Sequence, residues 1–324
     1  MSKIQEAREF LSDIEAFPPK LPHDPTLLPK LFASLSDKSF MSMQGLAALV
    51  ERSQSLAARV LTVANSAMYG LQGGVTSLTR AVQVLGLVEL RALVILFSAK
   101  GSIPDSKLPR AFPSRDLWEH QVRTAMLARQ MTLIIEGTGK KGEVALEADS
   151  IHTAALLHDL GKVILAARRP AVWAEISEIA RERGCGFAEA EEVYWGMDHG
   201  SAAAAMLNAW GLPDMLTQMI SWHHHPELTP NYKLETHILA AANHLADNNR
   251  SLLTDAPGEA APRLPERVRQ LLPDYAVALE SQADSLKHIV LDAKAEALAT
   301  LMTGLAKKTE RYLLCRTRNI PPSS

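Results

Sequence analysis

The chain has 324 residues, a length compatible with two structural units or with one large one. Hydrophobic residues make up 47% and charged residues 22%, as in a globular protein with a substantial core. The net charge of −2 argues against a general electrostatic attraction to nucleic acids or membrane surfaces.

The first thirty residues differ from a leader peptide. Residues 1–20 mix charged with apolar side chains, whereas a signal peptide has an uninterrupted apolar core. Residues 17–29 contain five prolines, which predicts an extended segment. The longest apolar run, over residues 92–99, is far shorter than the roughly 18 residues of a membrane span. We therefore expect a cytoplasmic protein that makes no membrane contact.

Helical periodicity dominates the rest of the chain. Apolar residues recur at spacings of three and four, for example over residues 56–64 and 82–93. No segment shows sustained strict alternation, so strands are scarce. Further breaks rich in glycine or proline occur at residues 100–114, 137–143 and 251–265. The sequence therefore predicts an all-α fold.

These breaks also predict a domain organisation. We expect an N-terminal helical lobe over residues 1–110 and a central helical lobe over residues 111–250. A connector and a C-terminal helical segment follow over residues 251–324, and packing of that segment on a second copy would give a homodimer. The two cysteines, Cys185 and Cys315, form no C-x-x-C motif and are expected to be reduced thiols.

His158 and Asp159 form the most informative pair of residues in the central lobe. They lie within an aliphatic stretch, residues 156–164, that predicts a largely buried helix. Burying an ionised aspartate is costly unless a metal ion or another cation compensates its charge. Gly161 follows closely, and its missing side chain would let another element approach.

Further histidines fall on separate predicted helices. His120 lies on the apolar face of a helix that starts near Asp116, where a single histidine is usually a core residue. His199 follows Asp198, a good N-cap. Residues 223–225 are histidines at the end of a later helix, where they would also interact favourably with the helix dipole. Together, several imidazoles and one carboxylate are typical of a hydrolytic metal centre.

Two N-terminal segments add a more specific pattern. Residues 61–70, LTVANSAMYG, and residues 78–87, LTRAVQVLGL, together with the ordered histidines, resemble the HDOD branch of the HD superfamily over about residues 20–250. The resemblance implies an all-α HD-superfamily helical bundle with two helical lobes, related to the HD-GYP phosphodiesterases of cyclic di-GMP. Many HDOD members are viewed as regulatory output modules. Within the first segment, Asn65 is interpreted as a structural, hydrogen-bonding residue.

The resemblance implies metal-binding roles for seven residues. Three match the first ligands of HD proteins: His120, His158 and Asp159. Three match the histidines with which HD-GYP enzymes extend the site to further metal ions: His199, His223 and His224. Asn243 takes the place of the last HD ligand, an aspartate, and is a weaker, neutral ligand. Asp247, one turn later, could replace it, although a solvated or capping role is favoured.

Charge limits the predicted metal site. Two divalent ions would bring four positive charges against one matched carboxylate, Asp159, so a two-metal site would be poorly held. We expect a single ion bound by His120, His158 and Asp159, assisted by His199 or Asn243, or else a relict site without metal. Histidine ligands favour zinc, iron, nickel or manganese over magnesium.

Three functions are compatible with the sequence. The favoured one is a regulatory signal-transduction module, not catalytically competent, whose inter-lobe groove binds a signalling protein partner or a nucleotide-type ligand.

The alternative is a metal-dependent phosphohydrolase acting on a nucleotide or cyclic dinucleotide phosphoester. Asp159 and Lys162 are its catalytic candidates, with Lys162 or Arg123 binding phosphate. The missing Gly-Tyr-Pro signature disfavours it, and nucleic-acid binding by the basic residues 300–324 is less favoured still.

Overall fold

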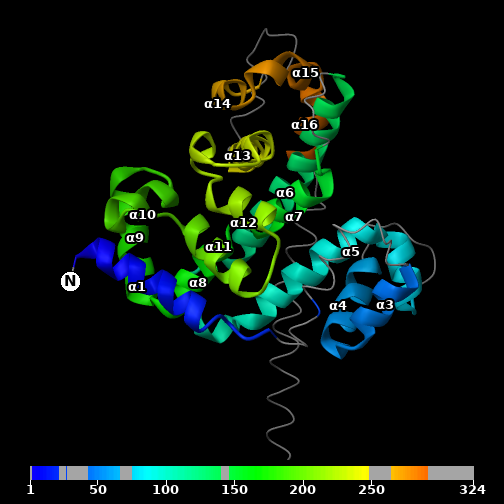
Figure 1. The fold of residues 1–324 in the computed structure, drawn as a ribbon, viewed down its shortest axis with the longest axis horizontal. Coiled ribbons are helices and arrows are strands. Elements are labelled where there is room, and N and C mark those ends of the chain that lie inside the picture. Colours follow the sequence, from blue (N-terminus) through cyan, green and yellow to red (C-terminus); the bar gives the residue numbers. More distant parts are fainter. Residues whose placement is uncertain are drawn as a thin grey trace, which may run out of the picture.

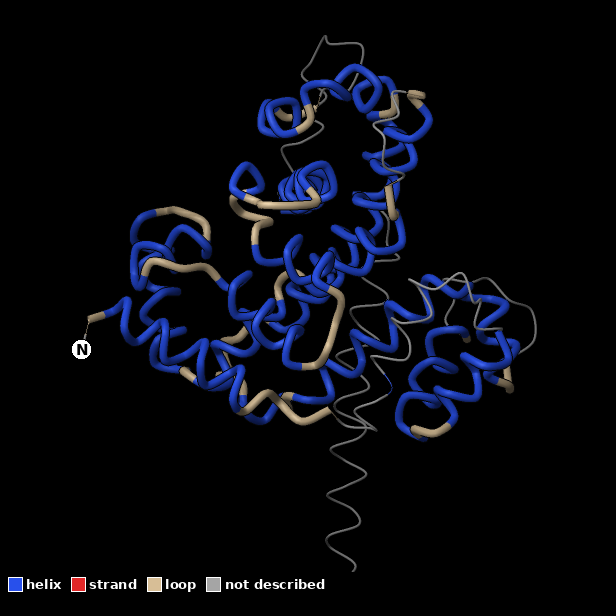
Figure 2. Tube along the Cα trace, in the orientation of Figure 1, coloured by secondary structure: helices blue, strands red, loops and turns tan. Residues whose placement is uncertain are grey.

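The computed structural model describes residues 2–21, 27, 43–65, 75–139, 146–247 and 264–290. Every regular element in this part of the chain is a helix, which confirms the predicted all-α class (Figure 2). The basic stretch 300–324, Cys315 and most of the connector 251–265 lie outside the described residues.

The helices form two lobes (Figure 1). In the smaller lobe, three helices pack on one another: α3 (Met43–Glu51), α4 (Gln54–Ala64) and α5 (Leu78–Ser102). The larger lobe contains α6 (Ser114–Gly137), α7 (Ala148–Leu157), α8 (Leu160–Arg168), α9 (Pro170–Arg183), α10 (Phe187–Trp195), α11 (His199–Ala209), α12 (Asp214–Ser221) and α13 (Lys233–Asp247). Its far end carries α14 (Glu266–Leu271), α15 (Ala276–Ser281) and α16 (Ala283–Val290).

The N-terminal helix α1 (Lys3–Ala16) packs against the larger lobe, on α10 and α11 (Figure 1). Its buried residues, Ala7, Phe10 and Ile14, recur at helical spacing and form one apolar face. The Phe10 ring stacks on Trp195 of α10, with ring centroids 5.4 Å apart. The chain therefore begins on the larger lobe and only afterwards enters the smaller one. The predicted division at residues 110 and 250 stays a prediction.

Helix α5 is bent at Gly86, whose φ of 80° and ψ of 163° interrupt the helix. Beyond the bend, residues 92–99 are buried, which explains the longest apolar run of the sequence. Among the described residues, no single helix is long and apolar enough to cross a membrane. Only the two halves of α5 taken together have that length and composition, and they meet at 105°.

Asn65 has the structural role expected for it. It ends α4, and its side chain exchanges two hydrogen bonds with the backbone of Val75, at 2.6 and 2.7 Å. A third bond reaches the Leu61 carbonyl. Asn65 thus fastens the end of α4 to the chain just before α5, independently of any ligand.

The aliphatic stretch over residues 156–164 is buried as predicted, but it is not one helix. Helix α7 ends at Leu157 and α8 begins at Leu160, so His158 and Asp159 lie at the break. This break turns both side chains toward the same interior region. The prediction of a continuous helix was wrong because the apolar pattern persists across the junction and hides it.

Gly161, the first residue after the start of α8, allows α11 to approach closely. A Cβ atom placed there would lie 1.9 Å from the carbonyl oxygen of His199. The predicted close approach at this glycine is therefore confirmed, and main chain contacts main chain next to the histidine.

We predict that Gly161→Ala lowers the free energy of unfolding by roughly 1–3 kcal/mol, because the backbone of His199 must move. Urea denaturation of the purified protein measures the loss. Gly186→Ala is the matched control, since nothing lies within 4 Å of a Cβ at that position. Equal denaturation midpoints for the two variants would contradict the packing argument.

Candidate metal centre

The structure brings together all seven residues predicted to bind metal. They come from α6, the α7–α8 break, the start of α11, the loop after α12, and α13: His120, His158, Asp159, His199, His223, His224 and Asn243. Six of the side chains form two groups of three, each compact enough to hold one ion, and Asn243 adjoins the first group. We call them together the inner centre.

The first group contains His120, His158 and Asp159. The Nε2 atoms of the two histidines are 3.2 Å apart, and the Asp159 carboxylate lies 3.4 Å from His158 and 3.8 Å from His120. The Oδ1 atom of Asn243 lies 2.8 Å from His120 Nε2. Three nitrogen or oxygen ligands and one amide oxygen therefore converge on one point.

The second group contains His199, His223 and His224. His224 Nε2 lies 3.1 Å from His199 Nε2, which in turn lies 2.9 Å from Asp159 Oδ1. Asp159 consequently adjoins both groups. The family resemblance implies this second set of ligands, whereas the shortage of negative charge disfavours a second ion; the structure groups the three histidines as the resemblance implies.

Backbone hydrogen bonds leave the ligand nitrogens of two buried histidines free. The Nδ1 atoms of His158 and His223 lie 2.7 Å from the carbonyl oxygens of Ala155 and Ile220, so each Nδ1 carries the proton and donates it. Their Nε2 atoms then keep a lone pair. His223 Nε2 is buried without any hydrogen-bond partner in the described structure, as a ligand atom that lacks its ion would be.

Burial keeps these imidazoles neutral. It lowers the pKa of His120 and of His158 to about 4, against the attraction of Asp159, and it lowers the pKa of His223 and His224 well below the ordinary value. Neutral imidazoles are the form that binds metal. The donor set of five histidines, one carboxylate and one amide fits a transition metal better than magnesium.

Lys162 compensates Asp159 when no ion is bound. Its ammonium nitrogen lies 2.8 Å from Asp159 Oδ2. Although burial opposes ionisation, His158 and the Lys162 ammonium hold the pKa of Asp159 well below its usual range. The sequence predicts a buried aspartate that needs a cation, and Lys162 is such a cation within the chain.

Glu191 is a functional residue that sequence reasoning missed. Fully buried on α10, it accepts hydrogen bonds from Nδ1 and from the backbone N–H of His199, at 2.6 and 2.9 Å. Burial opposes charge here, but the Glu191 carboxylate raises the pKa of His199 to about 9. Its position on the apolar face with Ala190 and Tyr194 was the only available signal. Carboxylates in this arrangement orient a metal-binding histidine.

Asp247 has a comparable relation to His120. One oxygen of its carboxylate lies 3.2 Å from His120 Nδ1, the nitrogen that points away from the first group. Asn243 lies at the other nitrogen, Nε2. Asp247 is exposed, as the favoured solvated role predicts, and its carboxylate is placed to orient His120 rather than to replace Asn243 as a ligand.

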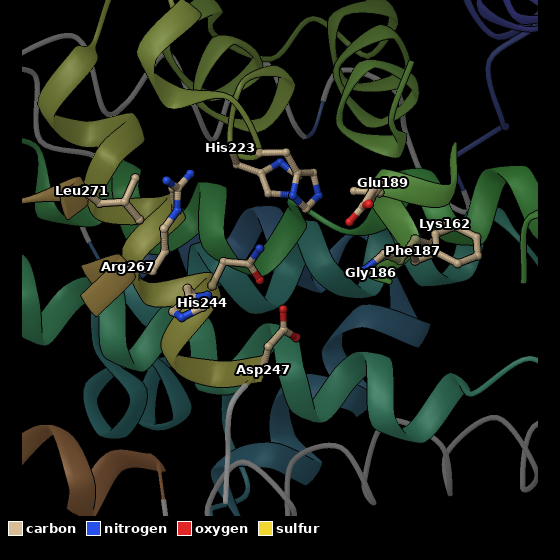
Figure 3. A pocket seen from close by; sticks show the side chains of 13 residues that line it. Lys162, Gly186, Phe187, Glu189, His223, His244, Asp247, Arg267 and Leu271 are labelled. Atoms are coloured by element: carbon tan, nitrogen blue, oxygen red, sulfur yellow. The ribbon is translucent and has the colours of Figure 1, made fainter. Parts of the chain in front are cut away.

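Two cavities open onto the inner centre, and Lys162, Phe187 and Asp247 line both. The first, of about 280 Å³, also contains His244 and Arg267 and is shown in Figure 3, where Arg267 reaches in from α14. The second, of about 270 Å³, has an apolar wall that includes Phe112 and Trp173. Neither contains a residue of the range 1–110, so the groove between the lobes stays a prediction.

Arg123 does not line either cavity. It is buried on α6 and pairs with Glu119 one turn earlier. Its predicted role as a phosphate ligand is therefore wrong in this structure, because a nearby acidic side chain already binds the guanidinium. Lys162 remains in position for such a role.

Comparison with known proteins shows the family and the fold. The sequence model of the HDOD domain family matches residues 21–226. A solved HDOD domain protein of unknown function from Geobacter sulfurreducens is 25% identical, with a TM-score of 0.63 over 94% of this chain and 97% of that one. A candidate signal transduction protein from Marinobacter aquaeolei VT8 has a TM-score of 0.69 at 20% identity, covering 94% of this chain and 67% of that one.

Two further similarities extend the comparison. A candidate phosphohydrolase from Shewanella amazonensis SB2B has a TM-score of 0.66 at 21% identity, over 90% of this chain and 98% of that one, which shows a shared fold. An uncharacterised protein of Treponema pallidum (strain Nichols) is 26% identical over 224 residues, or 69% of this chain. This chain spans about two-fifths of that relative, since the match covers 41% of it.

We predict that Glu191→Gln weakens metal binding by the second group roughly ten- to hundredfold, because His199 loses its orienting carboxylate. Titration of the metal-free protein with zinc measures the affinity. Glu189→Gln, the same substitution at the exposed rim of the cavity, should leave it unchanged. Equal affinities for both variants would exclude the orienting role.

The metal-free protein should lose stability as pH falls. The pKa values of His120 and His158 are about 4 in the fold, against about 6.5 in an unfolded chain. Between these values the unfolded chain binds protons that the folded protein does not, so the free energy of unfolding decreases from pH about 6.5 toward about 4. Urea denaturation across this range measures the slope.

His120→Gln should reduce that slope, whereas His237→Gln, outside the inner centre on α13, should keep it. An unchanged slope in His120→Gln would show that burial of His120 does not couple its protonation to folding.

Proposed function

The chain belongs to the HDOD domain family, and on this premise we propose that it is a regulatory module that binds a phosphorylated, nucleotide-type ligand at a metal-loaded inner centre. One observation carries the proposal. The inner centre combines five imidazoles and Lys162 with a single carboxylate, Asp159, that adjoins both ligand groups.

This composition leaves a metal-loaded centre with excess positive charge. Imidazoles bound to metal are neutral and, like the amide of Asn243, add no negative charge, so Asp159 supplies the one negative charge among the ligands. Two further carboxylates, Glu191 and Asp247, lie behind His199 and His120, and together with Asp159 they leave two divalent ions and Lys162 in excess. Lys162 adds a further positive charge at the same place. An anionic ligand such as a phosphate group would offset this excess, in a partly buried site where Coulomb interactions are strong.

Residues of the two cavities would bind different parts of the ligand. When bound, metal ions would supply Lewis-acid attraction for phosphate oxygens. Lys162 and Arg267, on opposite sides of the first cavity, are placed to bind the same group (Figure 3). Phe187 and Trp173 offer aromatic surface in the second cavity, where a nucleobase could stack.

The neutral Asn243 favours binding over turnover. An aspartate at this position would add charge to hold an ion and would provide an acceptor for protons. With Asn243 there, Asp159 is the one carboxylate among the seven residues of the inner centre, and Lys162 already neutralises it. The proposed signalling output then follows from ligand occupancy.

Phosphohydrolase activity is the second candidate function. A specific observation favours it: Asp159 of the first ligand group adjoins the second, and ions in both groups could clamp both oxygens of a phosphoester displacement. In that case Lys162 would bind the phosphate, and the apolar wall of the second cavity would exclude water.

The proposal is tested with manganese-loaded and metal-free protein, using inorganic phosphate and adenosine monophosphate as probes in calorimetry. We expect both probes to bind only the metal-loaded form, and the nucleotide to bind more tightly. Arg267→Gln should weaken both by roughly tenfold, the size of one charge-assisted hydrogen bond. Arg269→Gln is the matched control, because Arg269 lies on the same helix, pairs with Glu266 and lines neither cavity.

The outcomes separate the two functions. Absence of binding to the metal-loaded protein would overturn the proposed function. Multiple-turnover release of phosphate from the nucleotide would replace it with the phosphohydrolase. Trp173→Leu should weaken binding of the nucleotide but leave that of phosphate unchanged, since only the nucleotide reaches the aromatic wall.

A further inference from the structure

A third cluster of metal-ligating side chains lies outside the inner centre. Glu192, Asp198 and His225 each offer one ligand atom, and these atoms lie within 4.8 Å of one another. They come from α10, from the N-cap of α11 and from the loop after α12. We call them the outer cluster.

Each residue of the outer cluster is next in the sequence to a residue at the inner centre. These neighbours are three residues that form or orient the second ligand group: Glu191, His199 and His224. Three backbone segments thus carry one side chain toward the inner centre and the next toward the outer cluster. The two clusters therefore share a backbone frame but no ligand.

Asp198 is the buried member of the outer cluster. Only 5% of Asp198 is exposed, and Oδ1 caps α11 by accepting the backbone N–H groups of Gly200 and Ser201. Its other oxygen accepts no hydrogen bond within the described chain. This oxygen is therefore available to an ion held between Asp198, Glu192 and His225.

Solvent can reach the other two members. The side chains of Glu192 and His225 are 37% and 40% exposed, and Glu192 accepts a hydrogen bond from His225 Nε2. A metal ion could therefore enter from the surface, replace the His225 proton and keep water in its remaining coordination positions.

We propose that the outer cluster is a separate site for a divalent transition metal ion such as zinc, bound by one imidazole and two carboxylates. The imidazole selects against magnesium and calcium, which prefer all-oxygen sites. An ion there would clamp α10, the start of α11 and the loop after α12 to one another. It would thereby stabilise the segments that carry Glu191, His199 and His224, whether or not the inner centre binds a phosphorylated ligand.

The test counts zinc bound to the full chain. Protein stripped with a chelator is titrated with zinc alone, freed of unbound metal and analysed for its zinc content. His225→Gln and Glu192→Gln should each bind one equivalent fewer than the wild type. His237→Gln is the matched control and should bind as many as the wild type, because His237 belongs to none of the three clusters.

A second background separates this site from the inner centre. In the double variant His158→Gln/His223→Gln, one zinc equivalent should remain, and it should raise the midpoint of thermal unfolding. Adding His225→Gln should abolish both the bound zinc and the shift in midpoint.

Equal zinc content in His225→Gln and His237→Gln would overturn the proposal and leave the outer cluster as an ion pair beside a helix cap. Because zinc is the only probe, loss of phosphate binding in any variant has no effect on this result. Should the double variant fail to fold, which circular dichroism reveals, the comparison of single variants still decides.

Discussion

The structure depends on compensating one buried negative charge. Asp159 lies at the break between α7 and α8, almost fully excluded from water, and adjoins both ligand groups of the inner centre. An uncompensated carboxylate there would destabilise the fold by several kcal/mol. Lys162 compensates the charge of Asp159 in the metal-free protein, and bound metal ions would compensate it in the metal-loaded protein. The same charge therefore contributes to stability and confers affinity for cations.

Support for this arrangement extends outward in layers. His199 is held by Glu191 on α10, and α10 is held in turn by α1, because Phe10 of α1 stacks on Trp195 of α10. Through these contacts a helix that begins at residue 3 contributes to the position of a side chain in the inner centre. The smaller lobe contributes less directly, through the packing of α5 on α7.

The sequence allowed prediction of the all-α fold and of the converging residues, because helical periodicity and histidine–aspartate patterns are local properties. It could not reveal the break at His158, since the apolar pattern runs through it. Glu191 also escaped, because only tertiary packing shows that an acid on an amphipathic helix is buried beside His199. Arg123 was assigned to phosphate because the sequence does not show which acid, here Glu119, binds it first.

The contact between Gly161 and the carbonyl of His199 has a wider consequence. It joins α8, which follows Asp159, to the start of α11 by main chain alone, so the separation of the two ligand groups does not depend on any side chain in between. A substitution farther from this contact, as at Asn243 on α13, would leave the spacing of Asp159 and His199 unchanged. The residue types of the ligands and the spacing of Asp159 and His199 are thus set by different atoms, so that either can change without the other.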